Sequence, residues 1–413
     1  MSKNYANIYN SGNDSISLEQ RFYLKQETVR GVIEAPVGSD FFFHLPGGQI
    51  SYEQPFESSM QRSGRHHNNI IKKKITSAWN LSTYFNIDED AILGVTEIDP
   101  SLRVLWKSLL GNEATAPGLS YEPSEAPDLT FSLFEVGDTW SRQAAGAFVQ
   151  GGNVQLPGDG EATVEWTGNA KISYFVGIAQ SIAANDGGNT LQLEAGEARR
   201  IPKGALVMIV EADGLTRSDD TPDGSPRTVT ASNVTTDVIT VDGAVLADAD
   251  GSGVSLPIYV SYYEPETPVA IDNPVTGLEG SVSVVGLSSQ CFRSLGINVQ
   301  NNHELVDYCY GEEGLGGAVY IPGDRLTAEL TLSMNLNHTV GEFLNRRTTF
   351  ESEDITAVLG DSAGRHFKAL VPRAIFSVPA FAVPDTGSIP VEFSGTAYQT
   401  ANEAADELTV KFL

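Results

Sequence analysis

The stretch Ala374–Ala397, AIFSVPAFAVPDTGSIPVEFSGTA, repeats an earlier stretch, Ala147–Ala170, AFVQGGNVQLPGDGEATVEWTGNA, without a gap. The residue numbers differ by a constant 227, and the identical positions in the first copy are Ala147, Pro157, Gly160, Val164, Glu165, Gly168 and Ala170. Each copy indicates two strands joined by a turn, because Pro fixes φ where the turn starts and Gly accepts a positive φ where it ends. The repeat predicts that the chain carries one fold twice.

Elements upstream of this repeat also occur twice, with small gaps. The identities alone are compatible with a chance match, and the shared order of elements is what favours a duplication. A short helix with one apolar face is expected over Ser101–Leu110 and again over Thr339–Arg347. The other matching pairs are the alternating runs Lys74–Asn86 and Arg325–Asn337, the triplets Asp128-Leu129-Thr130 and Asp354-Ile355-Thr356, and the pairs Gly137-Asp138 and Gly360-Asp361. Each half therefore indicates strand, long loop, strand, helix and three strands.

The 413 residues are rich in Gly, Pro, Thr, Ser and Val in short alternating runs, which predicts a mostly β protein. We expect residues 1–36 to form an N-terminal arm, 37–176 the first fold, 177–270 an inserted small β-barrel or sandwich domain, and 271–413 the second fold. The insertion is expected because short strands such as Leu206–Glu211, Thr228–Ala231 and Val238–Val241 alternate with turn signals and have no counterpart elsewhere.

The chain is strongly acidic, with 53 Asp and Glu residues against 26 Lys and Arg and a formal net charge of -27. Such a chain repels nucleic acid phosphates, which argues against sequence-reading DNA or RNA binding. Cys291 and Cys309 are the two cysteines; nothing requires them to pair, and a reducing compartment suits the chain. The polar residues 1–13 and the lack of a long apolar run predict neither a secretory signal nor a membrane span.

Short patterns that suggest chemistry are better explained as turns and core residues. Residues 360–364, Gly-Asp-Ser-Ala-Gly, match the G-x-S-x-G nucleophile elbow, but that elbow joins a strand to a helix, and Arg365–Val371 indicates a strand. Residues 248–251 resemble part of a calcium loop, yet Tyr259 stands where its final Glu belongs. The histidines lack metal-ligand spacing, and the four tryptophans are expected in the core or an interface. We predict no catalytic residue, metal site or cofactor, and no enzyme.

These features resemble the major tail tube proteins of long-tailed, siphovirus-type bacteriophages. The resemblance implies two tandem β-sandwich or split-barrel folds, each with one short helix. In that family, six such folds form a ring whose inner sheets close into a continuous barrel. The resemblance assigns closing strands to Asp128–Gly137, Ala147–Leu156 and Ala162–Ala170, an inner hairpin with a long loop to Phe41–Asn86, and the same parts in the second half to Phe292–Asn337 and Asp354–Tyr398.

The resemblance also implies an assembly. Members with one copy of the fold form hexamers, so two fused copies predict a homotrimer with pseudo-sixfold symmetry and the insertion on the outside. The rings would stack into the tail tube of the virion, assembled in the host cytoplasm. Their partners would be the chain itself and the tape measure, terminator and distal tail proteins. DNA would pass through the lumen during genome ejection without specific binding, because an acidic wall makes few attractive phosphate contacts.

Glu53–Lys74 is the most basic window of this acidic chain and lies in the long loop of the first copy. One hypothesis is that this loop docks on an acidic face of the next ring. The other is an ordinary solvated charge run, which is the commoner case. The ring-stacking residues under the first hypothesis are Arg62, Arg65, His66, His67, Lys72, Lys73 and Lys74.

A second class of function stays open at this stage. A duplicated β protein also suits a binding module, such as another virion component, an adhesin or a lectin-like domain. The sequence lacks the cluster of aromatic residues with carboxylates that a sugar platform needs. Tubes or stacked rings of the purified chain would favour the tail tube, and compact monomers that bind glycan would favour the binding module.

Overall fold

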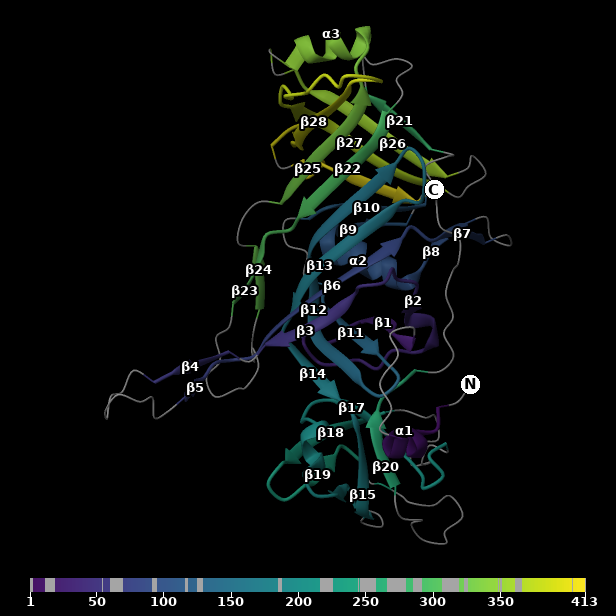
Figure 1. Ribbon diagram of the computed structural model, residues 1–413, viewed down its shortest axis with the longest axis vertical. Helices are drawn as coiled ribbons and strands as arrows, with labels where there is room; N and C mark the ends of the chain where they lie inside the picture. Colours follow the sequence, from purple (N-terminus) through teal and green to yellow (C-terminus); the bar gives the residue numbers. More distant parts are fainter. Residues whose placement is uncertain are drawn as a thin grey trace.

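The structure is a computed structural model of the 413-residue chain and is mostly β, with the second sheet, the first sheet and a small barrel stacked along its long axis (Figure 1). It describes residues 3–11, 19–53, 55–59, 70–90, 95–115, 118–124, 129–184, 188–215, 226–243, 245, 258–265, 280–284, 292–306, 319–322, 326–347, 349, 351–360, 366–402 and 404–412. Within these residues, no helix is long and apolar enough to cross a membrane.

The first copy of the fold is an antiparallel sheet in the order β3, β6, β13, β12, β11, β1. A further strand, β14, pairs with the first half of β12. The bounds are Gln49–Glu53 for β3, Thr76–Tyr84 for β6, Thr163–Ala170 for β13, Ser141–Pro157 for β12, Phe131–Val136 for β11, Arg21–Gln26 for β1 and Ile172–Val176 for β14.

The second copy repeats this order with β22, β25, β28, β27, β26 and β21, and β29 takes the place of β14. The bounds are Phe292–Gln300 for β22, Thr327–Asn335 for β25, Pro390–Ala397 for β28, His366–Phe376 for β27, Glu353–Gly360 for β26, Ser281–Val284 for β21 and Thr409–Phe412 for β29.

The strand registers of the two copies also agree. Trp166 lies opposite Leu81 in the first sheet, and their counterparts Phe393 and Leu332 lie opposite each other in the second. The β11–β12 ladder shifts register between Phe131 and Leu133, and the β26–β27 ladder shifts at the equivalent place, between Glu353 and Ile355. Because one slipped residue would turn every side chain to the other face, matching registers are stronger evidence for two copies of one arrangement than sequence identity is.

Two local expectations differ from the structure. Asp354 lies at the register shift between Glu353 and Ile355, and the equivalent residue of the first copy is Ser132, between Phe131 and Leu133. The triplet alignment with Asp128-Leu129-Thr130 was therefore wrong by four residues. Part of the expected N-terminal arm, Arg21–Gln26, is β1 and pairs with β11 as β21 pairs with β26. The shared bulges of β11–β12 and β26–β27 decide the first point, and the matching pairings of β1 and β21 decide the second.

Two ladders join the copies into one large sheet. The second half of β12 pairs with β22, and β10 (Leu119–Pro123) pairs with β29. On the core side, α2 (Pro100–Leu110) and α3 (His338–Arg347) lie where the sequence predicted helices. Trp106 of α2 meets Trp166 edge to face with centroids 5.0 Å apart, and Phe343 of α3 meets Phe393 in the same way at 4.9 Å.

The predicted insertion is a closed six-stranded barrel in the order β15, β16, β19, β18, β17, β20. Its strands are Ile178–Ala184, Thr190–Leu193, Val238–Val241, Arg227–Asn233, Leu206–Val210 and Ile258–Tyr262, in that order. The short helix α1 (Tyr5–Ser11) packs against it: Tyr5 Oη lies 2.9 Å from Glu264 Oε2, and Lys3 Nζ lies 3.2 Å from the same atom. The N-terminal residues 3–11 are therefore anchored to the barrel rather than extended as an arm.

Asp99 caps α2, where its Oδ1 accepts a hydrogen bond from the Ser101 backbone N–H at 3.0 Å. The residue is fully buried, and within the described chain its Oδ2 has no hydrogen-bond partner. Burial, reinforced by the nearby Asp40 carboxylate and opposed by Ser101, raises the pKa of Asp99 to about 7. The helix is thus capped by a carboxyl group that prefers to be neutral.

Asp99→Asn should stabilise the protein at pH 8 relative to wild type and lose most of that advantage near pH 4. In the unfolded chain the aspartate ionises near its usual pKa of about 3.9, whereas the folded chain keeps the proton up to about 7, so wild-type stability falls as pH rises through this window. Asparagine remains a good N-cap. Urea unfolding from pH 4 to 8 measures this, with the exposed Asp385→Asn as control; parallel curves for wild type and Asp99→Asn would contradict it.

Candidate functional site: the open face of the joined sheets

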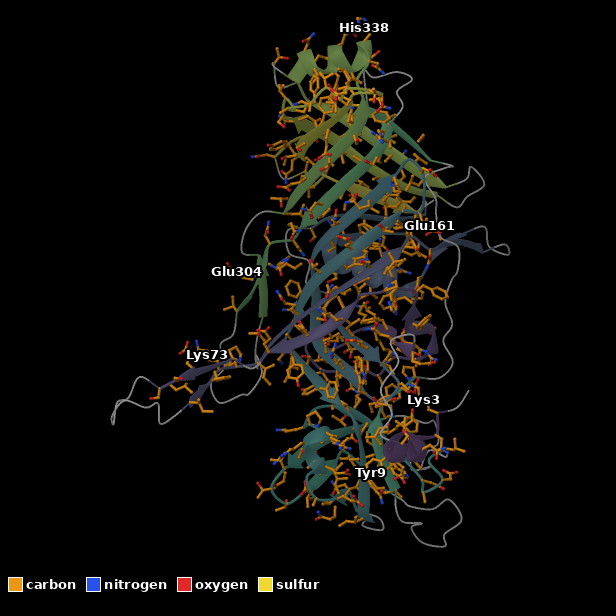
Figure 2. All side chains as sticks on the ribbon, in the orientation of Figure 1. Lys3, Tyr9, Lys73, Glu161, Glu304 and His338 are labelled. Carbon is orange, nitrogen blue, oxygen red and sulfur yellow. The ribbon has the colours of Figure 1, made fainter. Side chains whose placement is uncertain are left out.

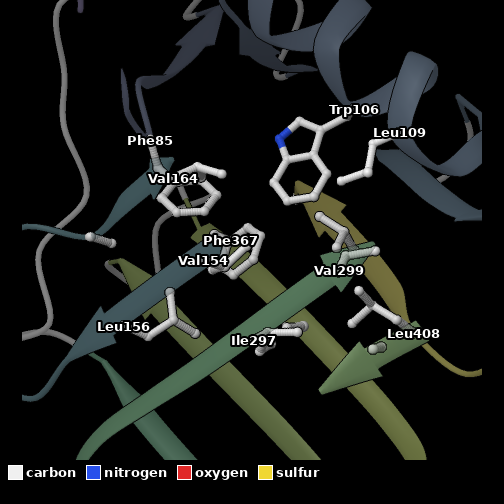
Figure 3. Close-up of a cluster of buried hydrophobic side chains, with 14 of the residues drawn as sticks. Phe85, Trp106, Leu109, Val154, Leu156, Val164, Ile297, Val299, Phe367 and Leu408 are labelled. Atoms are coloured by element: carbon white, nitrogen blue, oxygen red, sulfur yellow. The ribbon is translucent and has the colours of Figure 1, made fainter. Parts of the chain in front are cut away.

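In the described part of the chain, one face of the joined sheets carries no helix. In β6 and β25 alternate residues are buried and exposed, with the same pattern in both strands. The buried side chains form a core that continues from one copy to the other, as the cluster around Trp106, Val154, Ile297 and Phe367 shows (Figure 3). The other face, called the open face below, carries Asn80, Asn153, Gln155, Glu165, Thr167, Asn298, Gln300, Glu329, Thr331, Glu392 and Ser394.

The open face is continuous across the joint between the copies. The strand registers place one row of neighbouring residues across it: Ser82, Glu165, Asn153, Asn298, Glu329 and Thr396. On this face Asn153 Nδ2 donates to Glu165 Oε2 at 3.1 Å within the row, and the neighbouring Gln155 Nε2 donates to Asn153 Oδ1 at 2.8 Å. A surface of amides, hydroxyls and carboxylates held by its own hydrogen bonds is hydrated and offers nothing apolar to a partner.

Carboxylates outnumber cations on the strands of this face. Glu165, Glu329 and Glu392 point outward from β13, β25 and β28, and Glu165 and Glu392 occupy equivalent positions of the two copies. Of the described residues in β6, β13, β22, β25, β28 and residues 150–157 of β12, Arg293 at the start of β22 is the one cation. The face therefore repels a polyanion and lacks the Lys and Arg side chains that bind phosphates.

The expected ring-stacking residues fall mostly outside the described chain. Arg62, Arg65, His66 and His67 are not among the described residues. The loop's base is a two-stranded hairpin, β4 (Phe56–Ser58) with β5 (Ile70–Lys72), which extends away from the sheet (Figure 1). Lys72 ends β5, Lys73 forms an ion pair with Glu57 of the same hairpin, and Lys74 follows. The structure places Lys72, Lys73 and Lys74 at the base of this hairpin, where the sequence predicted a loop.

The second copy has a hairpin at the same place, β23 (His303–Val306) with β24 (Val319–Pro322). Both hairpins lie on one side of the molecule, where Lys73 and Glu304 are labelled (Figure 2). The first strand of each, β4 and β23, follows the end of β3 or β22 at the same spacing. The hairpins are therefore duplicated parts of the fold.

The patterns considered for chemistry have ordinary structural roles where they are described. β26 and β27 form an antiparallel hairpin in which Gly360 lies opposite His366, so the G-x-S-x-G pattern joins two strands rather than a strand and a helix. Trp79, Trp106 and Trp166 are buried, and Trp140 stacks on Phe175 with centroids 5.8 Å apart. Residues 248–251, Cys291 and Cys309 lie outside the described residues, within which no group of three or more His, Cys, Asp or Glu is placed to hold a metal.

The sequence interpretation missed the edges of the joined sheets. Residues 377–384 follow β27 and form no strand, and Val378, Phe381 and Val383 among them are exposed. The sequence did contain a signal for this edge, because residues 377–384 belong to the quoted repeat and their counterparts lie in β12. Comparison of the chain with protein-family models finds no match, and neither does comparison with the sequences of curated proteins.

Proposed function

We propose that this chain is a structural subunit that assembles into rings and stacks into a tube, as the tail tube protein of a long-tailed bacteriophage. The observation that carries the proposal is the joint between β12 and β22, where two copies of one sheet meet edge to edge inside a single chain. A fold that joins one copy to the next in this way extends by repetition and closes when the turn per copy completes a circle.

Six copies of the fold from three chains would form such a ring. The ring would then be a homotrimer with pseudo-sixfold symmetry. The position of the inserted barrel supports its placement on the outside of the ring. The barrel lies beyond β14, at the end of the molecule away from the second sheet, and interrupts neither sheet (Figure 1). In this role the chain belongs to the virion and contacts itself, the tape measure protein and the proteins at the two ends of the tail.

The open face supports a lumen for DNA. A conduit must let a polyanion slide, and a wall of amides, hydroxyls and carboxylates offers no counterion release to retain phosphates. Glu165 and Glu392, at equivalent positions, would repeat around the ring as a band of negative charge. Ring stacking through residues 53–74 stays a prediction, since most of that loop lies outside the described residues.

Negative-stain microscopy of the purified chain, with native mass spectrometry, tests the proposal. We expect rings or stacked tubes, and a ring mass of three chains of 44.3 kDa each. Single 44.3 kDa particles at every concentration, with or without glycan binding, would contradict the proposed function and favour a β-rich binding module. Six chains in a ring would contradict the trimer while leaving the tube intact.

A further inference from the structure

The joint inside the chain has a defined register. Seven residues of β12, Gly151–Pro157, pair with Ser294–Gln300 of β22, with Val154 opposite Ile297. The ladder continues at both ends: Gly158 N donates to Arg293 O at 2.8 Å, and Asn301 N donates to Gln150 O at 2.7 Å. Because antiparallel bonds alternate, the even-numbered residues of β12 direct their N–H groups toward β22.

Both halves of this joint recur elsewhere in the chain without a described strand beside them. The constant difference of 227 places Val378–Pro384 at the positions of Gly151–Pro157, and these residues form no strand. The matching registers of β3 and β22 on β6 and β25 place Gly47–Glu53 at the positions of Ser294–Gln300. β3 pairs with β6 along one edge and with no described strand along the other. On that second edge two side chains bond the backbone: Ile50 N donates to Glu135 Oε2 at 2.8 Å, and Gly48 O accepts from Gln20 Nε2 at 2.9 Å.

The unpaired segment is apolar at positions that are buried in the internal joint. Val378 is 56% exposed, Phe381 42% and Val383 70%. The counterparts of Phe381 and Val383 are Val154 and Leu156, which are both nearly fully buried between β13 and β22. Three large apolar side chains within six residues of one exposed edge indicate a surface that is covered in the assembled protein.

The hairpins give a second, independent observation. In the second copy His303, the first residue of β23, is buried with its ring 6.2 Å from the Phe148 ring of the first copy. Its counterpart is Phe56, the first residue of β4, which is 69% exposed. The counterpart of Phe148 is Ile375 of β27. A contact that exists once within the chain therefore recurs as two separate sides, of which Phe56 is exposed and Ile375 is half-buried.

We propose that Val378–Pro384 of one chain pairs antiparallel with Gly47–Glu53 of a second copy, with Phe381 opposite Ile50, and that Phe56 of the second copy covers Ile375 of the first. This inference deepens the proposed function, because it names the two edges that close the ring. In the internal joint Val154 and Leu156 direct their backbone N–H groups toward β22. Their counterparts, Phe381 and Val383, would donate in the same way to the second copy. Pro379 stands at a donor position and has no N–H, and the Ile50 N–H already donates to Glu135 Oε2. This ladder therefore holds two bonds fewer than the internal one while the Glu135 contact is kept.

Engineered disulfides test the register. Ala380 and Ser51 would face each other at a non-hydrogen-bonded pair, where side chains are closest, and both are exposed in the single chain. In a chain with Cys291→Ser and Cys309→Ser, we expect Ala380→Cys with Ser51→Cys to give covalent dimers and trimers on mild oxidation. The matched control, Ala380→Cys with Gln49→Cys, is displaced by two residues and should cross-link at least about tenfold more slowly, because its Cα separation exceeds disulfide geometry.

Assembly by microscopy of the same samples separates this inference from the proposed function. Rings that form without the Ala380–Ser51 cross-link, or that cross-link equally through Gln49, would overturn the joint and leave the tube proposal standing. Cross-linked oligomers without rings or tubes would support the joint and contradict the proposed function. Neither cross-links nor rings would overturn both.

Phe56→Asp tests the hairpin contact. The residue is exposed in the single chain, so the variant should fold with an unchanged melting temperature and shift the ring mass toward that of one chain. Val234→Asp in the barrel, a similarly exposed apolar residue, is the control and should assemble normally. Normal assembly of Phe56→Asp would overturn the contact with Ile375.

Discussion

The triple variant Glu165→Lys, Glu329→Lys and Glu392→Lys should bind a short DNA duplex that the parent chain ignores. These side chains lie on the open face, where the one described cation is Arg293. Three new cations release up to three counterions per chain, so we expect affinity to rise at least about tenfold at low salt and to fall with a log–log salt slope of roughly -2.7. Fluorescence anisotropy of a labelled duplex across salt concentrations measures both quantities.

A charge-matched control decides whether the face or the net charge is responsible. Glu122→Lys, Asp242→Lys and Glu342→Lys change exposed residues of β10, the barrel and α3, which lie off the open face, by the same total charge. If this control binds the duplex as tightly as the open-face variant, the open face has no special role and its place in the lumen is contradicted. Tubes formed from the open-face variant should also hold DNA that tubes of the parent release.

Trp106→Ala should destabilise the protein by about 3–5 kcal/mol, because it removes the largest side chain shared by both copies. The fully buried ring meets Trp166 of the first copy edge to face at 5.0 Å. It also stacks on Phe367 of the second copy at 6.4 Å and meets Phe412 edge to face at 6.3 Å. Its loss opens a cavity where the copies meet. Urea or thermal unfolding, followed by tryptophan fluorescence and circular dichroism, measures the change.

Two further substitutions test whether the loss comes from the contacts of Trp106 between the two copies. Trp106→Phe introduces the residue that the second copy carries at the equivalent position, Phe343, and removes an indole N–H that has no described partner, so it should cost much less than alanine. Trp140→Ala removes a half-buried ring stacked on Phe175 and should cost about 1 kcal/mol. Equal losses for Trp106→Ala and Trp140→Ala would contradict the role of Trp106 between the copies.

Sequence reasoning located the parts of the fold that leave a local pattern. Val164 and Trp166 alternate with polar residues, and the structure has them buried in β13. Gly160 and Gly387 end the matching turns and have φ of +107° and +92°, which is why glycine stands at both places. The helix α2 was expected from its apolar spacing and begins after the Asp99 cap. Period, turn chemistry and internal repetition carry this information within a few residues.

Features that depend on pairing between residues far apart in the sequence could not be predicted from local patterns. β1 and β21 share no identity across RFYLKQ and SVSV, so nothing local marked Arg21–Gln26 as part of the fold. The joint between β12 and β22 connects residues 137 to 149 apart across the inserted barrel, and Gly151 and Gly152 leave no side-chain pattern there. The open face follows from these pairings, so Glu165 and Glu329 became neighbours in one row only once the registers were known.

Because the β12–β22 joint lies within one polypeptide, half of the contacts in a closed ring would form during folding, independent of protein concentration. Only the remaining contacts would require diffusional encounters, each with its own loss of translational freedom. Nucleation by three molecules instead of six lowers the kinetic order of assembly. Substitutions can also change the strength of the fast, permanent contact within the chain separately from that of the slow, reversible contact between chains. A ring of identical single-copy subunits does not permit this.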